Sequence, residues 1–235
     1  MRERYVIIPA GGTGTRMGAE VPKQILPLCG KPVLRHTVEL FLGLPFKVNV
    51  IISINASIRG HWLDYCRKND FIFPCVLVSG GITRFHSVRK AMKYLPDGAL
   101  VAVHDGVRPL LRKDDVAALY AEAEEYPAVV PVIPVADSMR SVEESAGQDG
   151  IPVAITHVVD RSMYRLVQTP QIFHTEVLKK AYETAYSPDF TDDASVVEKN
   201  GIPLHFCRGS RFNIKLTTPE DMAVARAVME AGLLT

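Results

Sequence analysis

The fold is decided at residues 5–18, YVIIPAGGTGTRMG, where an apolar run leads directly into a glycine-rich loop. The run 5–8 is short and β-branched, which is typical of a buried strand. The glycines leave backbone N–H groups uncovered for a bulky anion, and Arg16 and Lys23 bring positive charge to the same region. The stretch therefore predicts either a tight turn after a strand or a loop that binds a polyphosphate.

Two familiar glycine motifs do not fit this loop. A P-loop requires Lys-Ser/Thr directly after its last glycine, and the segment from Gly12 to Gly18 has no such pair. A dinucleotide fingerprint requires a third glycine where this chain has Met17. No acidic residue closes the second predicted strand, at 48–54, so an NAD-dependent dehydrogenase is disfavoured.

The composition is that of an ordinary globular protein, with 235 residues, 47% of them hydrophobic and 23% charged. Lys and Arg number 27 against 26 Asp and Glu, so the net charge of +1 gives no general attraction to nucleic acid or acidic membranes. The four cysteines lack zinc spacing, which suits reduced thiols. No apolar run approaches the roughly 20 residues that span a bilayer, and the first residues lead into a strand. We expect a cytoplasmic protein with neither a membrane nor a nucleic-acid partner.

Strand-like and helix-like segments alternate through the first half of the chain. Strands are predicted at 48–54, 76–79, 100–103 and 128–135, and helices at 32–42, 57–69, 84–95 and 112–126. Further helices are expected at 175–185, at 192–199 and from Pro219, with a strand at 204–207. The rhythm predicts an α/β fold, a doubly wound and mostly parallel twisted sheet with helices on both faces, in a single domain over 1–235.

Polar or glycine-rich residues follow three of the predicted strands. The first glycine loop, Gly80-Gly81 and His104-Asp105 each come directly after an apolar run. Because ligands of such sheets gather at the carboxyl ends of the strands, these loops are predicted to share one site.

The alternation breaks at residues 137–160, where a polar, turn-rich segment is followed by the alternating run 151–159. This pattern predicts a protruding β-hairpin. Because a two-stranded arm is marginally stable alone, it indicates a homodimer contact, although a mobile surface hairpin also fits.

The motifs together resemble one family over almost the whole chain, the cytidylyltransferases of the isoprenoid pathway. The resemblance rests on 9–18, 22–24, 30–32, Gly80-Gly81-x-x-Arg84-x-x-Ser87, 104–109, 169–171, 191–195 and 213–215. It implies a Rossmann-like nucleotidyltransferase that joins CTP to 2-C-methyl-D-erythritol 4-phosphate and releases pyrophosphate. Such a transfer depends on positioning and positive charge, because a phosphate monoester is already a nucleophile.

The resemblance also implies roles for individual residues. Arg16, Lys23 and Lys215 match catalytic cations. Nucleotide-binding positions are matched by Ala10, Gly11, Gly12, Gly14, Thr15, Gly80, Gly81, Ser87 and Asp105. Polyol-phosphate positions are matched by Asp105, Arg108, Ser138, Arg161, Thr191 and Lys215. Asp105 is also the expected Mg²⁺ ligand, because magnesium favours carboxylate oxygen.

Several alternatives remain open from the sequence. A ribitol 5-phosphate cytidylyltransferase would share most of these motifs, although Ser138 and Arg161 favour the methylerythritol acceptor. A catalytically silent nucleotide-binding module would share the fold. Ile82 stands where a polar residue is expected, and His104 is expected to orient its strand end. Asp192 and Asp193 are expected to begin a helix in preference to binding a metal.

Overall fold

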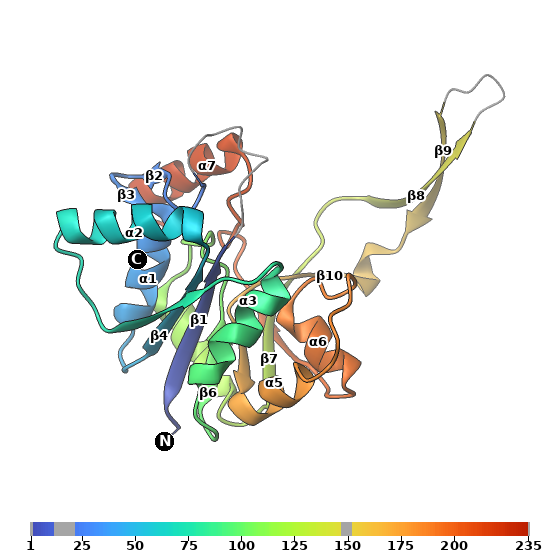
Figure 1. The fold of residues 1–235 in the computed structure, drawn as a ribbon. Coiled ribbons are helices and arrows are strands. Elements are labelled where there is room, and N and C mark those ends of the chain that lie inside the picture. The colour runs from blue at the N-terminus through green and yellow to red at the C-terminus, as the bar shows by residue number, and fades with distance from the viewer. Residues whose placement is uncertain (1, 12–21, 147–151, 235) are drawn as a thin grey trace.

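Figure 1 shows the computed structural model, which describes residues 2–11, 22–146 and 152–234. Within this part of the chain an eight-stranded sheet forms the centre of the molecule. Its strands lie in the order β5-β4-β1-β6-β11-β7, with β12 on the free side of β7 and β10 beside the end of β7. Their bounds are β1 Arg4–Ala10, β4 Asn49–Ile54, β5 Cys75–Ser79, β6 Leu100–Val103, β7 Ala128–Pro134, β10 Arg165–Val167, β11 Gln171–His174 and β12 His205–Arg208.

The sheet is mostly parallel, as predicted. β1 lies between β4 and β6 and is parallel to both, so that Ile7 pairs with Ile51 and with Val103. The exceptions are β10 and β11, which run antiparallel to their neighbours. Since β1, β4, β5 and β6 point the same way, the loops that follow them meet at one edge of the sheet.

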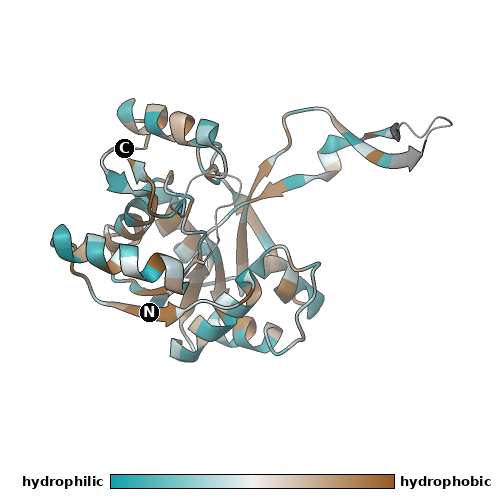
Figure 2. Ribbon diagram, turned by 45° about the horizontal axis from the view of Figure 1, so that its top comes forward, coloured by the Kyte–Doolittle hydropathy of each residue, from teal (hydrophilic) through white to brown (hydrophobic). Residues whose placement is uncertain are grey.

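Helices cover both faces of the sheet, as the alternation predicts. α1 (Val33–Leu42), α2 (Ala56–Lys68) and α4 (Lys113–Glu122) pack with Ile8 and Ile52 on one face. α3 (Arg84–Ala91), α5 (Thr175–Ala181) and α6 (Asp193–Lys199) pack with Ile7 and Ile51 on the other. Neighbouring strand residues serve opposite cores because successive side chains of a strand alternate between its faces. In Figure 2 the strands are brown and the outer sides of the helices largely teal, as this two-sided burial requires.

α7 (Pro219–Glu230) closes a third, smaller core with Leu28 of β2 (Pro27–Leu28) and Val33 of α1, and β2 pairs with β3 (Lys31–Pro32). Thr218 caps it: its side chain accepts from the Asp221 backbone N–H, and the Asp221 side chain accepts in return from the Thr218 N–H. Pro at the first helical position needs no N–H partner there, which makes this start of the helix well defined.

Three predicted elements end earlier than expected. α4 stops at Glu122 and not at 126, because Pro127 disfavours helical backbone at the residue before it, and residues 123–126 form turns. α5 ends at Ala181, and α3 ends at Ala91 and continues as the 3₁₀ turn Met92–Tyr94. The segment between β10 and β11 contains the cis peptide between Thr169 and Pro170.

The two strands of the expected hairpin lie at 139–146 and 152–159. β8 (Met139–Ala146) and β9 (Pro152–Val159) pair antiparallel and extend away from the body of the molecule (Figure 1). Val142 and Val158 lie on one face of the hairpin and are largely exposed.

No helix in the described ranges combines the length and apolar character needed to cross a membrane.

Candidate active site

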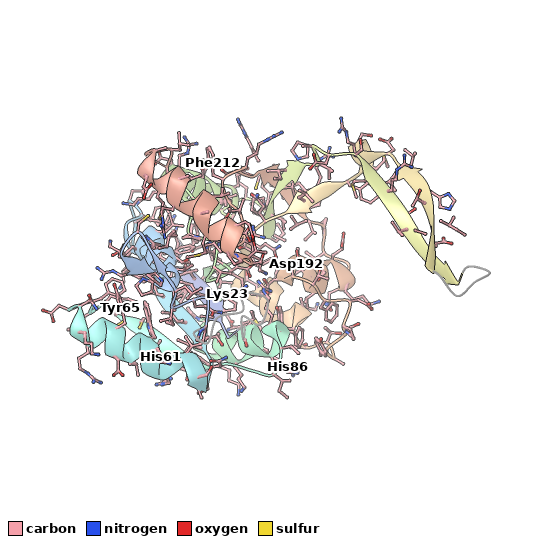
Figure 3. All side chains as sticks on the ribbon, turned by 90° about the horizontal axis from the view of Figure 1, so that it is seen from above. Lys23, His61, Tyr65, His86, Asp192 and Phe212 are labelled. Carbon is pink, nitrogen blue, oxygen red and sulfur yellow. The ribbon has the colours of Figure 1, made fainter. Side chains whose placement is uncertain are left out.

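A cleft with two lobes opens at the edge where β1, β5 and β6 end. The larger lobe, about 470 Å³, is lined by Pro9, Gly11, Lys23, Gln24, Gly81, Ile82, Thr83, Arg84, Ser87, Asp105, Val107, Lys215 and Thr217. The smaller lobe, about 230 Å³, is lined by Arg84, Asp105, Arg108, Val167, Gln168, Thr169, Gln171, Thr191, Asp192 and Lys215. Arg84, Asp105 and Lys215 belong to both lobes and therefore form their common wall. Figure 3 looks down on this edge, with Lys23 near the middle between α3 and α7 in this view.

Asp105, directly after β6, is a nearly buried carboxylate held by three cations. Its Oδ1 accepts from Arg84 Nε at 3.3 Å, and its Oδ2 lies 3.3 Å from Arg108 Nε and 3.0 Å from Lys215 Nζ. Burial raises the pKa of Asp105, but Arg84, Lys215 and Arg108 outweigh burial and hold this pKa well below its usual range. Asp105 is therefore ionised, and its single negative charge faces the positive charges of Arg84, Lys215 and Arg108.

His104 holds the strand end in place and does not face the cleft. This fully buried ring bonds through Nε2 to the Arg108 carbonyl oxygen at 2.9 Å, so Nε2 carries the proton. Its Nδ1 accepts from the Thr169 hydroxyl at 3.1 Å, and the same hydroxyl accepts from the Asp105 backbone N–H. Burial is the main reason why the pKa of His104 falls to about 4, so the ring is neutral at neutral pH. The expectation that His104 orients its strand end is confirmed.

Lys215 and Arg108 are placed by one buried residue, Asn213. The Asn213 side-chain amide donates to the Thr169 carbonyl at 2.7 Å, and the Asn213 backbone carbonyl accepts from Arg108 Nη1 at 2.7 Å. The Leu216 backbone N–H also donates to the Val107 carbonyl, which holds the next part of this segment beside the loop after β6. Segment 213–216 is thereby fixed against the end of β6, and Lys215 faces Asp105.

Two of the predicted glycines, Gly11 and Gly81, line the larger lobe. The Gly11 carbonyl accepts from the side chain of Asn55, the N-cap of α2, at 2.8 Å. A Cβ on Gly81 would lie 2.4 Å from His86 Cβ, so only glycine fits this turn. The Gly81 N–H donates to the Ser87 hydroxyl at 2.9 Å, so Ser87 supports the turn from within α3. Ala10 is fully buried at the end of β1, and Gly80 continues the sheet by bonding to the Ile54 carbonyl.

Not every predicted site residue is in the cleft of this chain. Lys23 lines the larger lobe and Thr191 the smaller one, while Gly12, Gly14, Thr15 and Arg16 lie outside the described residues. Ser138 and Arg161 stand at the base of the hairpin, where Arg161 Nη1 donates to the Ala136 carbonyl. Neither of these two lines the lobes.

Arg84 is the functional residue that sequence reasoning missed. Its position in the Gly80-Gly81-x-x-Arg84 motif was the available signal, but nothing in the sequence showed that it reaches Asp105. Ile82 does lie in the larger lobe, and its side chain is almost fully exposed.

The two aspartates that begin α6 have different surroundings. Asp192 is the N-cap and accepts from the Ser195 N–H at 2.8 Å, as expected. Asp193 instead turns inward to Arg84 and Tyr182. Throughout the described ranges, no three His, Cys, Asp or Glu side chains are grouped closely enough to hold a metal ion by themselves.

The arrangement suits a substrate rich in phosphate. Arg84, Arg108 and Lys215 can donate charge-assisted hydrogen bonds to phosphate oxygens, and an arginine fork matches phosphate geometry. The backbone groups around Gly11 and Gly81 line the larger lobe, where an extended ligand can approach them closely. Two lobes that share a cationic wall allow two substrates to meet at one centre.

Comparisons with known proteins give a consistent result over nearly the full chain. Residues 5–231 match the family model of 2-C-methyl-D-erythritol 4-phosphate cytidylyltransferase. The protein of that name from Bacteroides thetaiotaomicron is 41% identical over 227 residues, which cover 97% of this chain and 100% of the relative. The one from Porphyromonas gingivalis is 43% identical over 229 residues, or 97% and 98% of the two chains. The crystal structure of the Francisella tularensis 2-C-methyl-D-erythritol 4-phosphate cytidylyltransferase is 30% identical, has a TM-score of 0.76 and covers 96% of this chain and 99% of that one.

Proposed function

The chain belongs to the 2-C-methyl-D-erythritol 4-phosphate cytidylyltransferase family, and we propose that the two-lobed cleft is where it performs the family's reaction. The protein is a CTP-dependent nucleotidyltransferase that transfers the cytidylyl group to 2-C-methyl-D-erythritol 4-phosphate in isoprenoid precursor synthesis. The observation that carries the assignment to this cleft is the ionised Asp105, which lies with Arg84 and Lys215 at the wall common to both lobes and also contacts Arg108 of the smaller lobe.

The chemistry explains why this wall is cationic. A phosphate oxygen of the polyol attacks the α-phosphorus of CTP, and the bond between that phosphorus and the bridging oxygen to the β-phosphorus breaks. The electron pair leaves with pyrophosphate, so negative charge develops on the α-phosphoryl oxygens and on the leaving group. Positioned cations stabilise this charge, and no general base is required.

The larger lobe is the proposed CTP site. Backbone groups at Ala10, Gly11, Gly80 and Gly81, together with Ser87, would surround the cytosine and ribose, and the loop with Gly12, Gly14 and Thr15 would surround the triphosphate. Arg16 and Lys23 would stabilise the reacting phosphates. Backbone groups at these glycines would read the exocyclic amino group of the base, and the packing of Gly81 against His86 fixes the turn that presents them.

The smaller lobe is the proposed polyol-phosphate site. Arg108 and Lys215 would hold its phosphate beside the α-phosphorus, with Thr191 as a hydroxyl ligand. The volumes of about 470 and 230 Å³ favour the nucleotide in the larger lobe and the smaller acceptor here.

Asp105 fits the proposed Mg²⁺ requirement as a single-carboxylate site. Magnesium commonly uses one or two carboxylates plus substrate phosphates and keeps several waters. Asp105 is ionised and lies in both lobes, so it and the triphosphate would hold the ion together. When bound, the metal ion supplies further positive charge to the phosphate oxygens.

We further propose that the chain is one nucleotidyltransferase domain, that it acts in the cytoplasm, and that residues 137–160 form a dimerisation arm. The exposed Val142 and Val158 support the last point, because they share one face of the hairpin. In a homodimer, Ser138 and Arg161 would complete the polyol-phosphate site of a second copy.

Pyrophosphate release from CTP and Mg²⁺ tests the assignment, with 2-C-methyl-D-erythritol 4-phosphate and ribitol 5-phosphate as competing acceptors. We expect turnover with the first acceptor and little with the second, and loss of turnover when Lys215→Ala removes a cation from the common wall. Faster turnover of ribitol 5-phosphate would overturn the choice of acceptor. CTP binding without pyrophosphate release from either would instead indicate a silent nucleotide-binding module.

A further inference from the structure

Arg84 bridges two carboxylates that come from distant parts of the chain. Its Nε donates to Asp105 Oδ1 at 3.3 Å, and its Nη2 donates to Asp193 Oδ2 at 2.6 Å. Asp105 faces the cleft, whereas Asp193 is fully buried at the start of α6. The guanidinium that lines both lobes is therefore held from behind by a residue that no substrate reaches.

Both oxygens of the Asp193 carboxylate have partners. Oδ2 accepts from Arg84, and Oδ1 accepts from the Tyr182 hydroxyl at 2.6 Å. Burial, followed by the Asp193 charge, raises the pKa of Tyr182 well above its usual value, so the hydroxyl remains protonated and donates.

Aromatic packing fixes this donor relative to α3. Tyr182 stacks on Phe85 with ring centroids 4.5 Å apart, and Phe85 also stacks on Phe190 at 5.8 Å. Phe85 follows Arg84 in the same helix. The stack of Tyr182 on Phe85 therefore ties the Tyr182 hydroxyl, which binds Asp193, to the helix that carries Arg84.

Stability alone gives a weak reason for such a buried ion pair. Removing two charges from water is costly, and apolar residues of similar volume usually stabilise a core at least as well. What a buried pair does provide is a fixed direction for the arginine, which matters at a reacting phosphate because small displacements lower the rate strongly.

We propose that Asp193 and Tyr182 are positioning residues that hold the Arg84 guanidinium in the wall common to the two lobes during cytidylyl transfer. The inference rests on the proposed function of the cleft. In this proposal Arg84 contacts the substrates, and Asp193 acts only by holding Arg84 in place.

A double-mutant cycle on activity tests this dependence. The variants are Asp193→Asn, Arg84→Met and the two combined, each assayed for pyrophosphate release from CTP and 2-C-methyl-D-erythritol 4-phosphate after circular dichroism has shown a folded protein. In the wild-type background we expect Asp193→Asn to lower kcat/KM by about 10- to 100-fold, by analogy with other residues that orient a functional group. In the Arg84→Met background the same substitution should change kcat/KM by less than about twofold. Equal losses in both backgrounds would overturn the proposal, because Asp193 would then act on the fold and not through Arg84.

Tyr182→Phe is the milder variant and decides the matter if Asp193→Asn is recovered unfolded. It removes one hydrogen bond while the ring stack remains, so we expect a loss of about 3- to 10-fold in kcat/KM. Tyr120→Phe is the matched control: Tyr120 is fully buried against the opposite face of the sheet, and its hydroxyl donates to the Tyr5 carbonyl at 2.7 Å. It should lower thermal stability and leave kcat/KM unchanged.

Equal losses of kcat/KM in Tyr182→Phe and Tyr120→Phe would also overturn the proposal. Failure of the proposed function is seen separately, since the wild-type protein would then release no pyrophosphate.

Discussion

Lys23 lines the larger lobe, and its proposed task is to stabilise charge that develops only during the reaction. We expect Lys23→Ala to lower kcat by about 100- to 1,000-fold, the range found when one electrostatic stabiliser is removed, with little change in KM for CTP. Steady-state kinetics measure both constants. Lys68→Ala, at the exposed end of α2, is the control and should match the wild type. An unchanged kcat with a raised KM would mean that Lys23 only binds the nucleotide.

His104 makes the stability of the protein depend on pH. Its pKa is about 4 in the folded state, mainly because of burial, against about 6.5 in the unfolded chain. Between pH 4 and pH 6.5, His104 is mostly protonated in the unfolded chain and mostly neutral in the folded protein. The stabilisation is therefore complete above pH 6.5 and is lost as the pH falls toward 4, by at most about 3 kcal/mol.

Urea unfolding of wild type and His104→Gln at several pH values measures this contribution. The free energy of unfolding of the wild type should fall more steeply between pH 6.5 and 4 than that of the variant, whose side chain does not titrate in this range. Parallel curves would show that His104 is protonated as readily in the folded protein as in the unfolded chain.

The sequence predicted the residues of the common wall only in part. Asp105 follows an apolar strand run, so its place at the sheet edge was predictable, and the resemblance supplied Lys215 together with Arg108 of the smaller lobe. The bond between Arg84 and Asp193 was not predictable, because the two are 109 residues apart and belong to different helices. The apolar pattern of each helix does not show which distant side chain its charged residues contact. This contact forms only when the two helices pack on the same face of the sheet.

The turn between β5 and α3 depends on one of its two glycines. A Cβ on Gly81 would meet the backbone carbon of His86 at 2.7 Å, whereas the nearest atom to a Cβ on Gly80 would be 3.5 Å away. We expect Gly81→Ala to lower the free energy of unfolding by about 1–3 kcal/mol and to weaken CTP binding, because the turn has to shift. Gly80→Ala should change the free energy of unfolding by less than about 1 kcal/mol.

Urea titration and equilibrium binding of CTP measure these two effects. Similar losses for both glycines would show that the turn moves as a whole and that the close approach at residue 81 has no particular role.

Elements were predicted well where apolar periodicity was strong and poorly at their ends. The strand at 100–103 and the start of α7 agree with the structure to the residue, because burial and a capping threonine determine them locally. The helix predicted at 112–126 is longer than α4, because charged and alanine residues continue the helical pattern up to Pro127. The antiparallel direction of β11 was not predicted either, because a short strand carries no record of its direction.

Whether the arm joins two copies is decided by its exposed apolar face. Val158 is 77% exposed and lies diagonally across the hairpin from Val142. In a dimer it would be buried, so Val158→Asp should weaken dimerisation by about 100-fold or more, because a carboxylate would be taken out of water. Light scattering after size-exclusion chromatography measures the mass. Ile72→Asp, at an equally exposed apolar residue outside the arm, should leave the mass unchanged. Equal masses for wild type and Val158→Asp would remove the arm from the interface.

The position of Arg161 gives the dimer a consequence for activity. Its side chain lies at the base of the arm, outside both lobes of its own chain, so a role in catalysis requires that it enter the cleft of a second copy. Arg161→Ala and Lys215→Ala should then each be inactive alone and restore activity when their subunits are mixed, because one cleft of each mixed dimer combines an intact Lys215 with an intact Arg161. With equal amounts and free exchange, half of the dimers are mixed and half of their clefts are complete, so about one quarter of the wild-type kcat is expected.

Mixing Lys215→Ala with Lys23→Ala is the control: both residues line the same cleft of one chain, so every mixed dimer retains one defect in each cleft and no activity should return. If the mixture of Arg161→Ala and Lys215→Ala also stays inactive, Arg161 serves its own chain.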